Sequence, residues 1–383
     1  MHKIFQNFLD FFKKGDMVLL GLCLLTTAFG CVIISSATAE MGALRFVLVQ
    51  LAATAIGILL FMIFSSIDLD FLLEHRTFLF LFNAFMILLL IPFGVERGGN
   101  VSWIHIPLLP IMLQPAEICK MTYILLLASV INAHQSRLSS WRTILHLGFH
   151  VGIFLILNMA ISGDAGVSLI FVFIALGMAY GCGIRMGWFY AAAGGLAVVG
   201  PIIWTKVMKD YQRRRFQVLW NPELDPLAIN ERYHTNRALQ SLTGGGLTGQ
   251  GLYHGARTSS GALFAQHTDY IFASIGEELG FLGCMAVIIL EFAIIMRCFY
   301  VGIRTPDFVR RVICFGCASA LIFQVASNIG MCLGLTPVIG LTLPFISYGG
   351  SSILSLYAML GLVSGVFSNP SPGRQGAYIR PPR

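Results

Sequence analysis

The chain has 383 residues, of which 56% are hydrophobic and 11% are charged, and its mean hydropathy is +0.78. This composition excludes a soluble globular protein, because a soluble chain of this length cannot bury so much apolar surface, and it predicts an integral membrane protein. The net charge of +7 comes from basic residues scattered between apolar segments, so it does not indicate a nucleic-acid-binding protein.

Ten apolar segments follow one another along the chain, and each has the length of a transmembrane helix. A helix needs about 20 apolar residues to cross the hydrocarbon core of a bilayer. The Leu, Phe, Ile and Ala content of the segments favours helices over the alternating strands of a barrel. The predicted spans are 17–37, 45–66, 77–94, 115–133, 144–161, 166–184, 187–205, 270–296, 312–334 and 348–368. The sequence therefore predicts an all-α polytopic membrane protein that forms a single membrane domain, 1–383.

The distribution of Lys and Arg predicts the orientation of these spans. With the N-terminus in the cytoplasm, most basic residues outside the segment 206–269 lie in inner loops, as the positive-inside rule expects. The N-terminal lysines and the first apolar run imitate a signal peptide, but the run has full membrane length, so an uncleaved first span is favoured. The Pro-, Gly- and Arg-rich tail 369–383 is predicted to be disordered on the cytoplasmic side.

Three ionisable residues stand at positions where a membrane makes them costly. Glu117 and Lys120 share one face of the fourth span, where each alone would cost about 2.5–3.5 kcal/mol or more. They form either a structural ion pair or a pair that lines a substrate cavity, and their spacing leaves both interpretations open. Asp164 lies between two spans on the predicted outer side, where it serves either as a helix cap or as part of a site.

The segment 206–269 is the one polar stretch of the sequence large enough to build a site, and it is predicted to be a large extracytoplasmic loop between the seventh and eighth spans. It contains Arg213, Arg214 and Arg215 and a glycine run at 244–251. Glycine lets backbone N–H groups approach a phosphate, so a diphosphate site beside the arginines competes with a flexible turn. The run lacks the Gly-Lys-Ser/Thr of a Walker loop, and the loop lacks the aromatic interleaving of a nucleic-acid-binding patch.

Asp269 ends this loop directly before the eighth span. A carboxylate at the mouth of a membrane helix is costly unless it is used, which makes Asp269 the leading functional candidate. Glu277 lies about two helical turns further on, where it is placed either to line the same cavity or to make an interhelical hydrogen bond. The segment 341–352 combines Pro and Gly at a membrane boundary, and broken backbone there is tolerated only when it is buried or lines a wet cavity.

The nine cysteines lie in or beside apolar segments, and none lies in the polar loop. This distribution argues against a disulfide framework. Cys314 and Cys317 have the spacing of a redox or metal pair, but an interpretation as small buried hydrophobic residues is favoured. The sequence therefore predicts no metal site.

Five motifs occur in a recognisable order. They are Gln114-Pro115-Ala116-Glu117 with Lys120, Asp210-Tyr211-Gln212-Arg213-Arg214-Arg215, His267-Thr268-Asp269-Tyr270-Ile271-Phe272 with Glu277-Glu278-Leu279-Gly280, Ser327-Asn328-Ile329-Gly330-Met331, and Leu343-Pro344-Phe345-Ile346-Ser347-Tyr348-Gly349-Gly350-Ser351-Ser352. Together they resemble the SEDS family (shape, elongation, division and sporulation), the RodA/FtsW/SpoVE-type peptidoglycan polymerases. The resemblance runs from about Gly98 to Gly365, and ten spans fit the family.

The resemblance implies an enzyme, a glycosyltransferase that joins lipid II units into glycan strands outside the cytoplasmic membrane in elongation, division or sporulation. The family's essential aspartate falls on Asp269, which would act as general base on the 4-hydroxyl of the acceptor GlcNAc. That oxygen would attack the donor MurNAc with inversion, and undecaprenyl diphosphate would leave. The substrate-binding candidates are Glu117, Lys120, Asp164, Arg213, Arg215, His267, Thr268, Glu277, Ser347 and Ser351.

The resemblance also bears on cofactors, partners and competing functions. The leaving diphosphate needs charge stabilisation from arginine, lysine or a divalent cation, Mg²⁺ or Mn²⁺. The expected partner is a class B penicillin-binding transpeptidase. A lipid II flippase and a non-catalytic scaffold of the cell-wall synthesis complex are the alternatives. The clustering of ionisable residues toward the outer side favours the enzyme over the flippase, and the intact Asp269 speaks against the scaffold.

The sequence departs from the family pattern at positions around the expected site. The differing residues are Ser102 in place of an Arg before Trp103, Phe264 and Ala265 in place of Pro-Glu, Gly261 in place of an acidic residue, and Ala116 in place of a Ser. Because Asp269 is kept, the chemistry is expected to survive while contacts to the donor or acceptor are remodelled.

Overall fold

The structure is a computed structural model that describes residues 13–97, 99–105, 112–208, 210–225, 232–263 and 265–370. Two features of the sequence analysis lie outside these residues. They are the substitution at Phe264 and the tail beyond residue 370.

All ten predicted spans form helices. Among the described residues, nine helices are long and apolar enough to cross a membrane, and the 17-residue apolar helix α9 completes the set. The spans are α2 (Met17–Ala37), α3 (Ala43–Ser66), α5 (Arg76–Leu88) with α6 (Leu90–Phe93), α7 (Pro115–Ala133), α8 (Trp141–Ile161), α9 (Ala165–Gly181), α10 (Met186–Ile202), α14 (Ile271–Arg304), α15 (Phe308–Cys332) and α16 (Gly350–Ser368). The prediction of a polytopic helical membrane protein is confirmed, although α14 runs eight residues beyond its predicted end.

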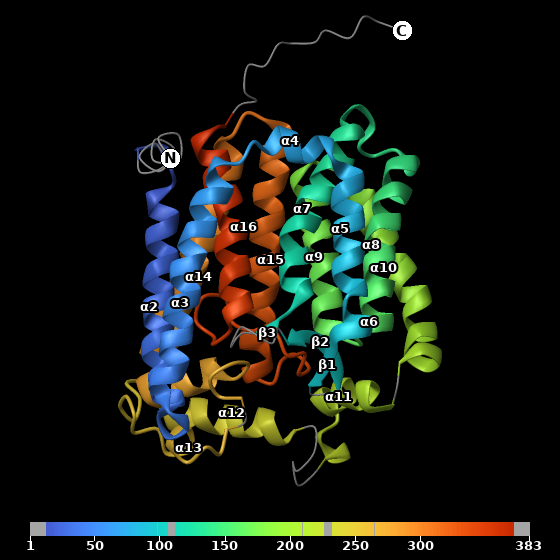
Figure 1. Cartoon of the computed structure of the whole chain (residues 1–383). Coiled ribbons are helices and arrows are strands. Elements are labelled where there is room, and N and C mark those ends of the chain that lie inside the picture. The colour runs from blue at the N-terminus through green and yellow to red at the C-terminus, as the bar shows by residue number, and fades with distance from the viewer. Residues whose placement is uncertain are drawn as a thin grey trace, which may run out of the picture.

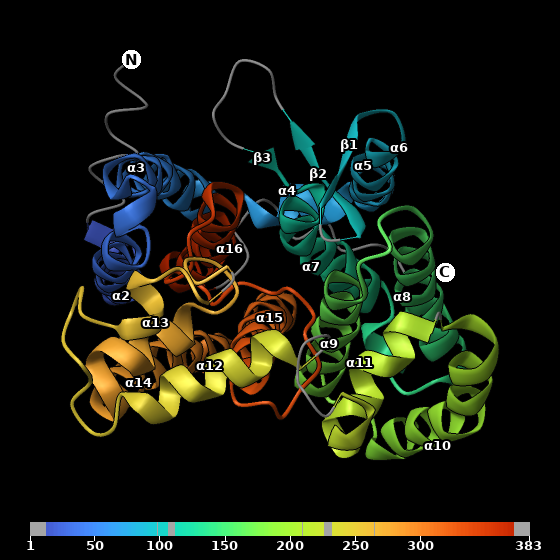
Figure 2. The same ribbon diagram turned by 90° about the horizontal axis from the view of Figure 1, so that it is seen from below.

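The interior of the bundle is built around α7, α15 and α16. Nearly every residue of α7 and α16 is buried, whereas no residue of α10 is buried. Seen along the bundle axis, α7 and α15 lie centrally and α10 lies at the edge (Figure 2). The polar residues Glu117, Lys120, Thr122 and Ser129 of α7 are therefore buried inside the bundle.

The two ends of the bundle differ in composition. The start of α2 and the end of α16 lie together at one end, where the Ser368 hydroxyl donates to the Lys14 carbonyl at 3.1 Å (Figure 1). The polar segment gathers at the opposite end. Its helices are α11 (Asp210–Trp220), α12 (Tyr233–Gly244) and α13 (Ala256–Ser259). The remaining short helices among the described residues are α4 (Leu69–Glu74), η1 (Ala39–Met41), η2 (Gln135–Arg137), η3 (Ile203–Val207) and η4 (Pro222–Leu224).

A small antiparallel sheet at the same end as α12 was not predicted. Its strands are β1 (Gly94–Arg97), β2 (Asn100–His105) and β3 (Met112–Leu113), in the order β1-β2-β3. Strands of two to six residues are too short to show an alternating pattern, which explains why the sequence did not reveal them. The Val101 amide donates to the Ser162 carbonyl at 3.0 Å, so the sheet is tied to the α8–α9 connection.

The glycine run 244–251 packs into a break in α14. Gly280 interrupts the helix with φ 64° and ψ −160°, a conformation that favours glycine. The amides of Gln250 and Gly251 donate to the carbonyls of Glu277 and Glu278 at 2.9 Å, and the amide of Phe281 donates to the Gly246 carbonyl at 2.9 Å. The run therefore satisfies the backbone groups that the break exposes, and this role replaces both the flexible turn and the diphosphate cradle considered from the sequence.

Candidate active site

Asp269 sits on a turn directly before α14, and the backbone of this turn is held at three consecutive carbonyls. The His267 carbonyl accepts from the Tyr348 amide at 2.9 Å, and the Thr268 carbonyl accepts from the Ser347 hydroxyl at 2.7 Å. The Asp269 carbonyl accepts from Asn328 Nδ2 at 2.8 Å. Because three carbonyls are bound by α15 and by the segment before α16, the backbone that carries the Asp269 side chain is held in place.

The segment before α16 is the broken backbone that the sequence predicted. The Ser347 hydroxyl, besides holding Thr268, accepts from the Leu343 amide at 2.9 Å. Gln50 of α3 spans the segment, since its Nε2 donates to the Ser347 carbonyl at 3.1 Å and its Oε1 accepts from the Gly349 amide at 3.3 Å. The segment is thus buried and hydrogen-bonded, as unpaired backbone at a membrane boundary requires. Ser351 lies just beyond it and is also buried.

Asp269 is a partly exposed residue whose carboxylate lies close to the loop after α15. A Cβ built on Gly340 would lie 3.7 Å from its Oδ2, an ordinary van der Waals contact, and it is the φ of 65° at position 340 that favours glycine there. Burial raises the pKa of Asp269 to about 6, with a further rise from the charge of Asp164, while a hydrogen bond from the Thr268 side chain lowers it. A carboxylate with this pKa is ionised at neutral pH and is still basic enough to accept a proton.

Asp164 is a helix cap and also a neighbour of Asp269. Its Oδ1 accepts from the Val167 amide at 3.1 Å at the start of α9, and its Oδ2 accepts from the Ser102 hydroxyl at 3.2 Å. Burial raises the pKa of Asp164, against the lowering effect of these hydrogen bonds. Ser102 stands where the family pattern expects an arginine, so Asp164 has a neutral partner from β2 in place of a cation.

Glu117 and Lys120 form a closed ion pair inside the bundle. Lys120 Nζ lies 2.8 Å from Glu117 Oε2, and it also donates to Gln324 Oε1 at 3.2 Å. The Ser355 hydroxyl donates to Glu117 Oε2 at 2.7 Å. The two side chains are 5% and 3% exposed, so their polar atoms are satisfied by protein groups. The structure therefore supports the structural ion pair, and a direct contact with substrate stays a prediction.

The two candidate arginines of α11 are directed differently. Arg213 Nη2 forms an ion pair with Asp210 Oδ1 at 3.0 Å, one turn away on the same helix. Arg215 Nη1 reaches the Val338 carbonyl at 3.4 Å, in the loop that leads to Gly340 and the Asp269 carboxylate. Of the two, Arg215 is the one that the structure brings toward the site.

His267 is half-buried between aromatic rings. Its ring centroid lies 5.2 Å from that of Phe46 and 5.8 Å from that of Tyr348. Burial lowers its pKa, so His267 is neutral at neutral pH. The Thr268 hydroxyl donates to the Ala265 carbonyl at 3.3 Å within the same turn. Both residues shape the turn that carries Asp269.

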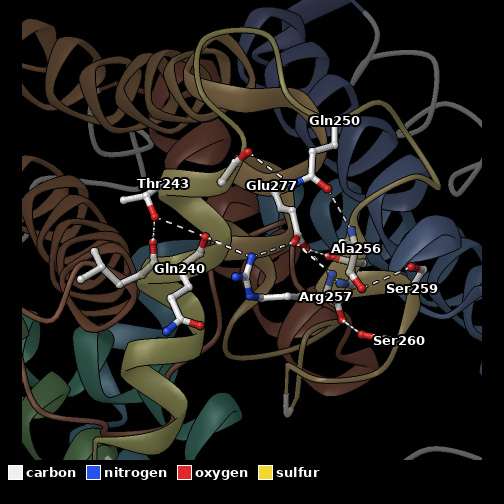
Figure 3. Close-up of polar contacts among 11 residues, drawn as sticks. Gln240, Thr243, Gln250, Ala256, Arg257, Ser259, Ser260 and Glu277 are labelled. Atoms are coloured by element: carbon white, nitrogen blue, oxygen red, sulfur yellow. Dashed lines mark hydrogen bonds and ion pairs between the residues drawn. The ribbon is translucent and has the colours of Figure 1, made fainter.

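Glu277 makes interhelical hydrogen bonds from α14 to α13, which is one of the two alternatives that the sequence left open. Its side chain is fully buried and points toward Arg257 (Figure 3). Its two oxygens accept from the amides of Arg257 and Thr258 and from the Thr258 hydroxyl at 2.8–3.0 Å. Arg257 Nη1 lies 3.6 Å away. The carboxylate is therefore directed into the fold of the polar loop and away from a substrate-facing surface.

Asn328, Gln266 and Ser102 are site residues to which sequence reasoning gave no role. Asn328 and Ser102 stood in or beside the motifs that carried the family resemblance, but nothing in their pattern indicated a contact with Asp269 or Asp164. Gln266 precedes the His267 motif by one position, and only the structure shows which carbonyls it binds.

Among the described residues, no group of three or more His, Cys, Asp or Glu side chains is placed to hold a metal ion, and all nine cysteines are free and buried.

Comparison with known proteins finds one matching family model and several similar proteins. A family model described as "Cell cycle protein", for FtsW, RodA and SpoVE, matches residues 16–370. The chain is 30% identical over 365 residues to the peptidoglycan glycosyltransferase MrdB of Escherichia coli (strain K12), covering 95% of this chain and 96% of the relative. It is 29% identical over 361 residues to stage V sporulation protein E of Bacillus subtilis (strain 168), covering 92% and 96%.

Solved structures share the fold. One is the structure described as "Structural coordination of polymerization and crosslinking by a peptidoglycan synthase complex", in which a chain matches with a TM-score of 0.79 at 26% identity, covering 93% of this chain and 98% of that chain. The rod shape determining protein RodA of Thermus thermophilus matches with a TM-score of 0.65 at 23% identity, covering 92% of this chain and 96% of that one.

Proposed function

Because the chain belongs to the FtsW, RodA and SpoVE family and is a peptidoglycan glycosyltransferase, we propose that it polymerises lipid II with Asp269 as the general base. The observation that carries this proposal is the setting of Asp269. Three backbone anchors fix its turn, and burial beside a second acid raises its pKa to about 6. An acid that is held rigidly and is poised near neutral pH suits proton abstraction from a hydroxyl.

The proposed reaction is a single displacement. Asp269 takes the proton of the 4-hydroxyl of the acceptor GlcNAc, and that oxygen attacks the anomeric carbon of the donor MurNAc. The bond to undecaprenyl diphosphate breaks with its electron pair on the leaving diphosphate. An α-linked donor thus gives a β-1,4 bond without a covalent intermediate, and the proton on Asp269 is afterwards released to water. General base assistance of this kind contributes about 10²–10⁴-fold to a rate.

The leaving diphosphate needs positive charge, and we assign Arg215 to this role ahead of Arg213 and Lys120. Arg213 is paired with Asp210, and Lys120 is paired with Glu117 inside the bundle. Arg215 reaches the loop that faces Asp269. A divalent cation, Mg²⁺ or Mn²⁺, that binds together with the diphosphate is the alternative source of charge.

The proposal includes an orientation and a partner. The polar segment lies at the end of the bundle opposite the start of α2 and the end of α16 (Figure 1). With the termini in the cytoplasm, the segment and Asp269 face the outer side, where assembled lipid II is polymerised. A class B penicillin-binding transpeptidase is the proposed partner, supported by the match to a chain of a peptidoglycan synthase complex.

The test is a polymerisation assay with purified protein and lipid II, in which glycan ladders are resolved by gel. We expect Asp269→Asn and Asp269→Ala to lower the rate by about 10²–10⁴-fold. Asp210→Asn, which removes an exposed carboxylate from the same polar segment, is the matched control and should retain most of the activity. Near-wild-type polymerisation by Asp269→Asn would overturn the assignment of the base.

A further inference from the structure

A continuous chain of buried hydrogen bonds begins at Glu277 and leads back to the Asp269 turn. The Glu277 carboxylate holds the first turn of α13 by accepting from two backbone amides and from the Thr258 hydroxyl (Figure 3). The Thr258 side chain is 2% exposed and Glu277 is fully buried, so water does not compete for these bonds. Removing the carboxylate would leave buried donors unsatisfied, which makes α13 dependent on Glu277.

The second link is Gln266. Its Nε2 donates to the Thr258 carbonyl at 2.9 Å and to the Ala37 carbonyl at the end of α2 at 2.7 Å. Gln266 is 5% exposed. One amide group therefore joins α13 to the first span, immediately before the residues of the catalytic turn.

The third link is the turn itself. Ala265, beside Gln266, has a φ of 50°, and its carbonyl accepts from the amides of Thr268 and Tyr270 at 3.0 and 3.2 Å. The Ser274 hydroxyl of α14 donates to the Gln266 carbonyl at 3.3 Å. Gln266 is thus the point at which the turn is anchored on its N-terminal side, whereas the three carbonyls of His267, Thr268 and Asp269 anchor it on the other side.

From these contacts we propose that Glu277, Thr258 and Gln266 are positioning residues that fix the place of the Asp269 carboxylate relative to the acceptor hydroxyl. The inference rests on the proposed function of Asp269. It assigns Glu277 to catalysis without substrate contact, through α13 and Gln266. A displacement of about 1 Å at a reacting group can lower a rate by about 10²-fold, so loosening one anchor has a measurable effect on turnover.

The test uses paired conservative variants and separates kcat from KM for lipid II. Thr258→Val removes the hydroxyl that binds Glu277 and keeps the side-chain shape, whereas Thr258→Ser keeps the hydroxyl. We expect Thr258→Val to lower kcat by about tenfold or more while KM changes little, and Thr258→Ser to retain kcat. Glu277→Gln, which keeps one acceptor oxygen, and Gln266→Met should also lower kcat at nearly unchanged KM.

Thr243→Val is the matched control, because the Thr243 hydroxyl bonds only to carbonyls of its own helix, α12, at 2.9 and 3.3 Å. It makes the same chemical change outside the chain of bonds and should leave kcat unchanged. The inference is overturned if Thr258→Val and Glu277→Gln keep wild-type kcat, or if Glu277→Gln raises KM at unchanged kcat, which would indicate substrate contact. Each variant is scored only on protein that elutes as the folded monodisperse species, and Thr258→Ser shows whether position 258 tolerates change.

This outcome is distinguishable from failure of the proposed function. If Asp269→Asn polymerises lipid II normally, the general base assignment fails. If Asp269→Asn is inactive while the Thr258 and Glu277 variants turn over like the wild type, the general base stands and only the positioning role fails.

Discussion

Glu117 and Asp269 are two acidic residues whose surroundings have opposite effects on their negative charge. Glu117 has a lysine Nζ at 2.8 Å and a serine hydroxyl at 2.7 Å, and its side chain is enclosed in α7. Among the residues that the structure describes, Asp269 has no such ion pair; it is partly exposed and lies near a second acid, Asp164. A compensated acid is stabilised as a charge and serves the fold, whereas an acid whose charge is opposed by its neighbours is ready to take a proton.

The largest expected effect on the difference between these two acids comes from removing Lys120, the cation beside Glu117. Lys120→Met leaves Glu117 as an uncompensated buried charge and is expected to destabilise the protein by about 3–5 kcal/mol. Thermal unfolding in detergent, followed by tryptophan fluorescence or by loss of the monodisperse peak, measures the effect.

The double variant Glu117→Gln with Lys120→Met is the control for this prediction. It removes both charges, and an uncharged pair of similar size should recover most of the lost stability. If the double variant is as unstable as Lys120→Met, or if Lys120→Met unfolds like the wild type while polymerisation is lost, the pair belongs to the substrate site and the contrast with Asp269 fails.

The two acids also differ in the helix beside them, because Asp269 lies on the turn before the broken helix α14, whereas Glu117 lies within the unbroken helix α7. A Cβ at Gly280 would clash with the Gly249 amide nitrogen, and the φ of 64° disfavours any other residue. Gly280→Ala is therefore expected to lower the free energy of unfolding by about 1–3 kcal/mol. It should also lower activity, because it disturbs the part of α14 that follows the Asp269 turn. Gly148→Ala in α8, where a Cβ meets nothing within 4 Å, is the control in the same unfolding assay and should be neutral or stabilising.

The spans and their order could be predicted from the sequence because hydrocarbon imposes one length and one composition on every crossing helix. The small sheet could not be predicted, because its strands are too short to show an alternating pattern of apolar and polar residues. The predicted eighth span ends at 296, directly before Arg297, whereas α14 continues for eight residues to Arg304. Arg297 lies within this helix and pairs with Asp16 at 2.9 Å.

The candidate site was predictable in its chemistry and only partly in its geometry. Asp269 was singled out because an acid at a membrane boundary is costly, and this argument does not require knowledge of which residues contact Asp269. The contacts of Glu277 and of the glycine run 244–251 join residues up to 35 positions apart, as between Gly246 and Phe281. They also depend on a break in α14 that a helical pattern does not show. The interpretation that Glu277 lines the cavity of Asp269 assumed one continuous helical face from Asp269 to Glu277. In the structure the carboxylate of Glu277 binds α13.

The influence of the second acid on Asp269 can be measured by removing its charge. Because Asp164 raises the pKa of Asp269, Asp164→Asn should lower it and move the acid limb of kcat/KM from about pH 6 to lower pH. Asn is also a good N-cap, so α9 should keep its start. Polymerisation rates measured on both sides of pH 6 check the shift. Asp68→Asn, at the opposite end of the bundle near α4, removes the same charge and should leave the limb in place. An acid limb that stays at pH 6 in Asp164→Asn would show that burial alone sets the basicity of Asp269.

The smallest expected effect is the change in stability of Asp269→Asn, and its sign is opposite to that of removing the charge of Glu117. The pKa of Asp269 is raised in the folded protein, from 3.8 to about 6, so the folded state binds a proton more tightly than the unfolded state does. The resulting stability is fully present below the unfolded pKa and is lost as pH rises through the folded pKa, which means that ionised Asp269 is a cost at neutral pH. Asp269→Asn should therefore unfold at the same temperature as the wild type or a higher one at pH 8, while its polymerisation is lost. Glu117→Gln should unfold at a lower temperature, because it leaves Lys120 without its anion. A clear loss of stability in Asp269→Asn at pH 8 would mean that the Asp269 carboxylate is a structural group like Glu117, and the proposal of a poised base would lose its physical ground.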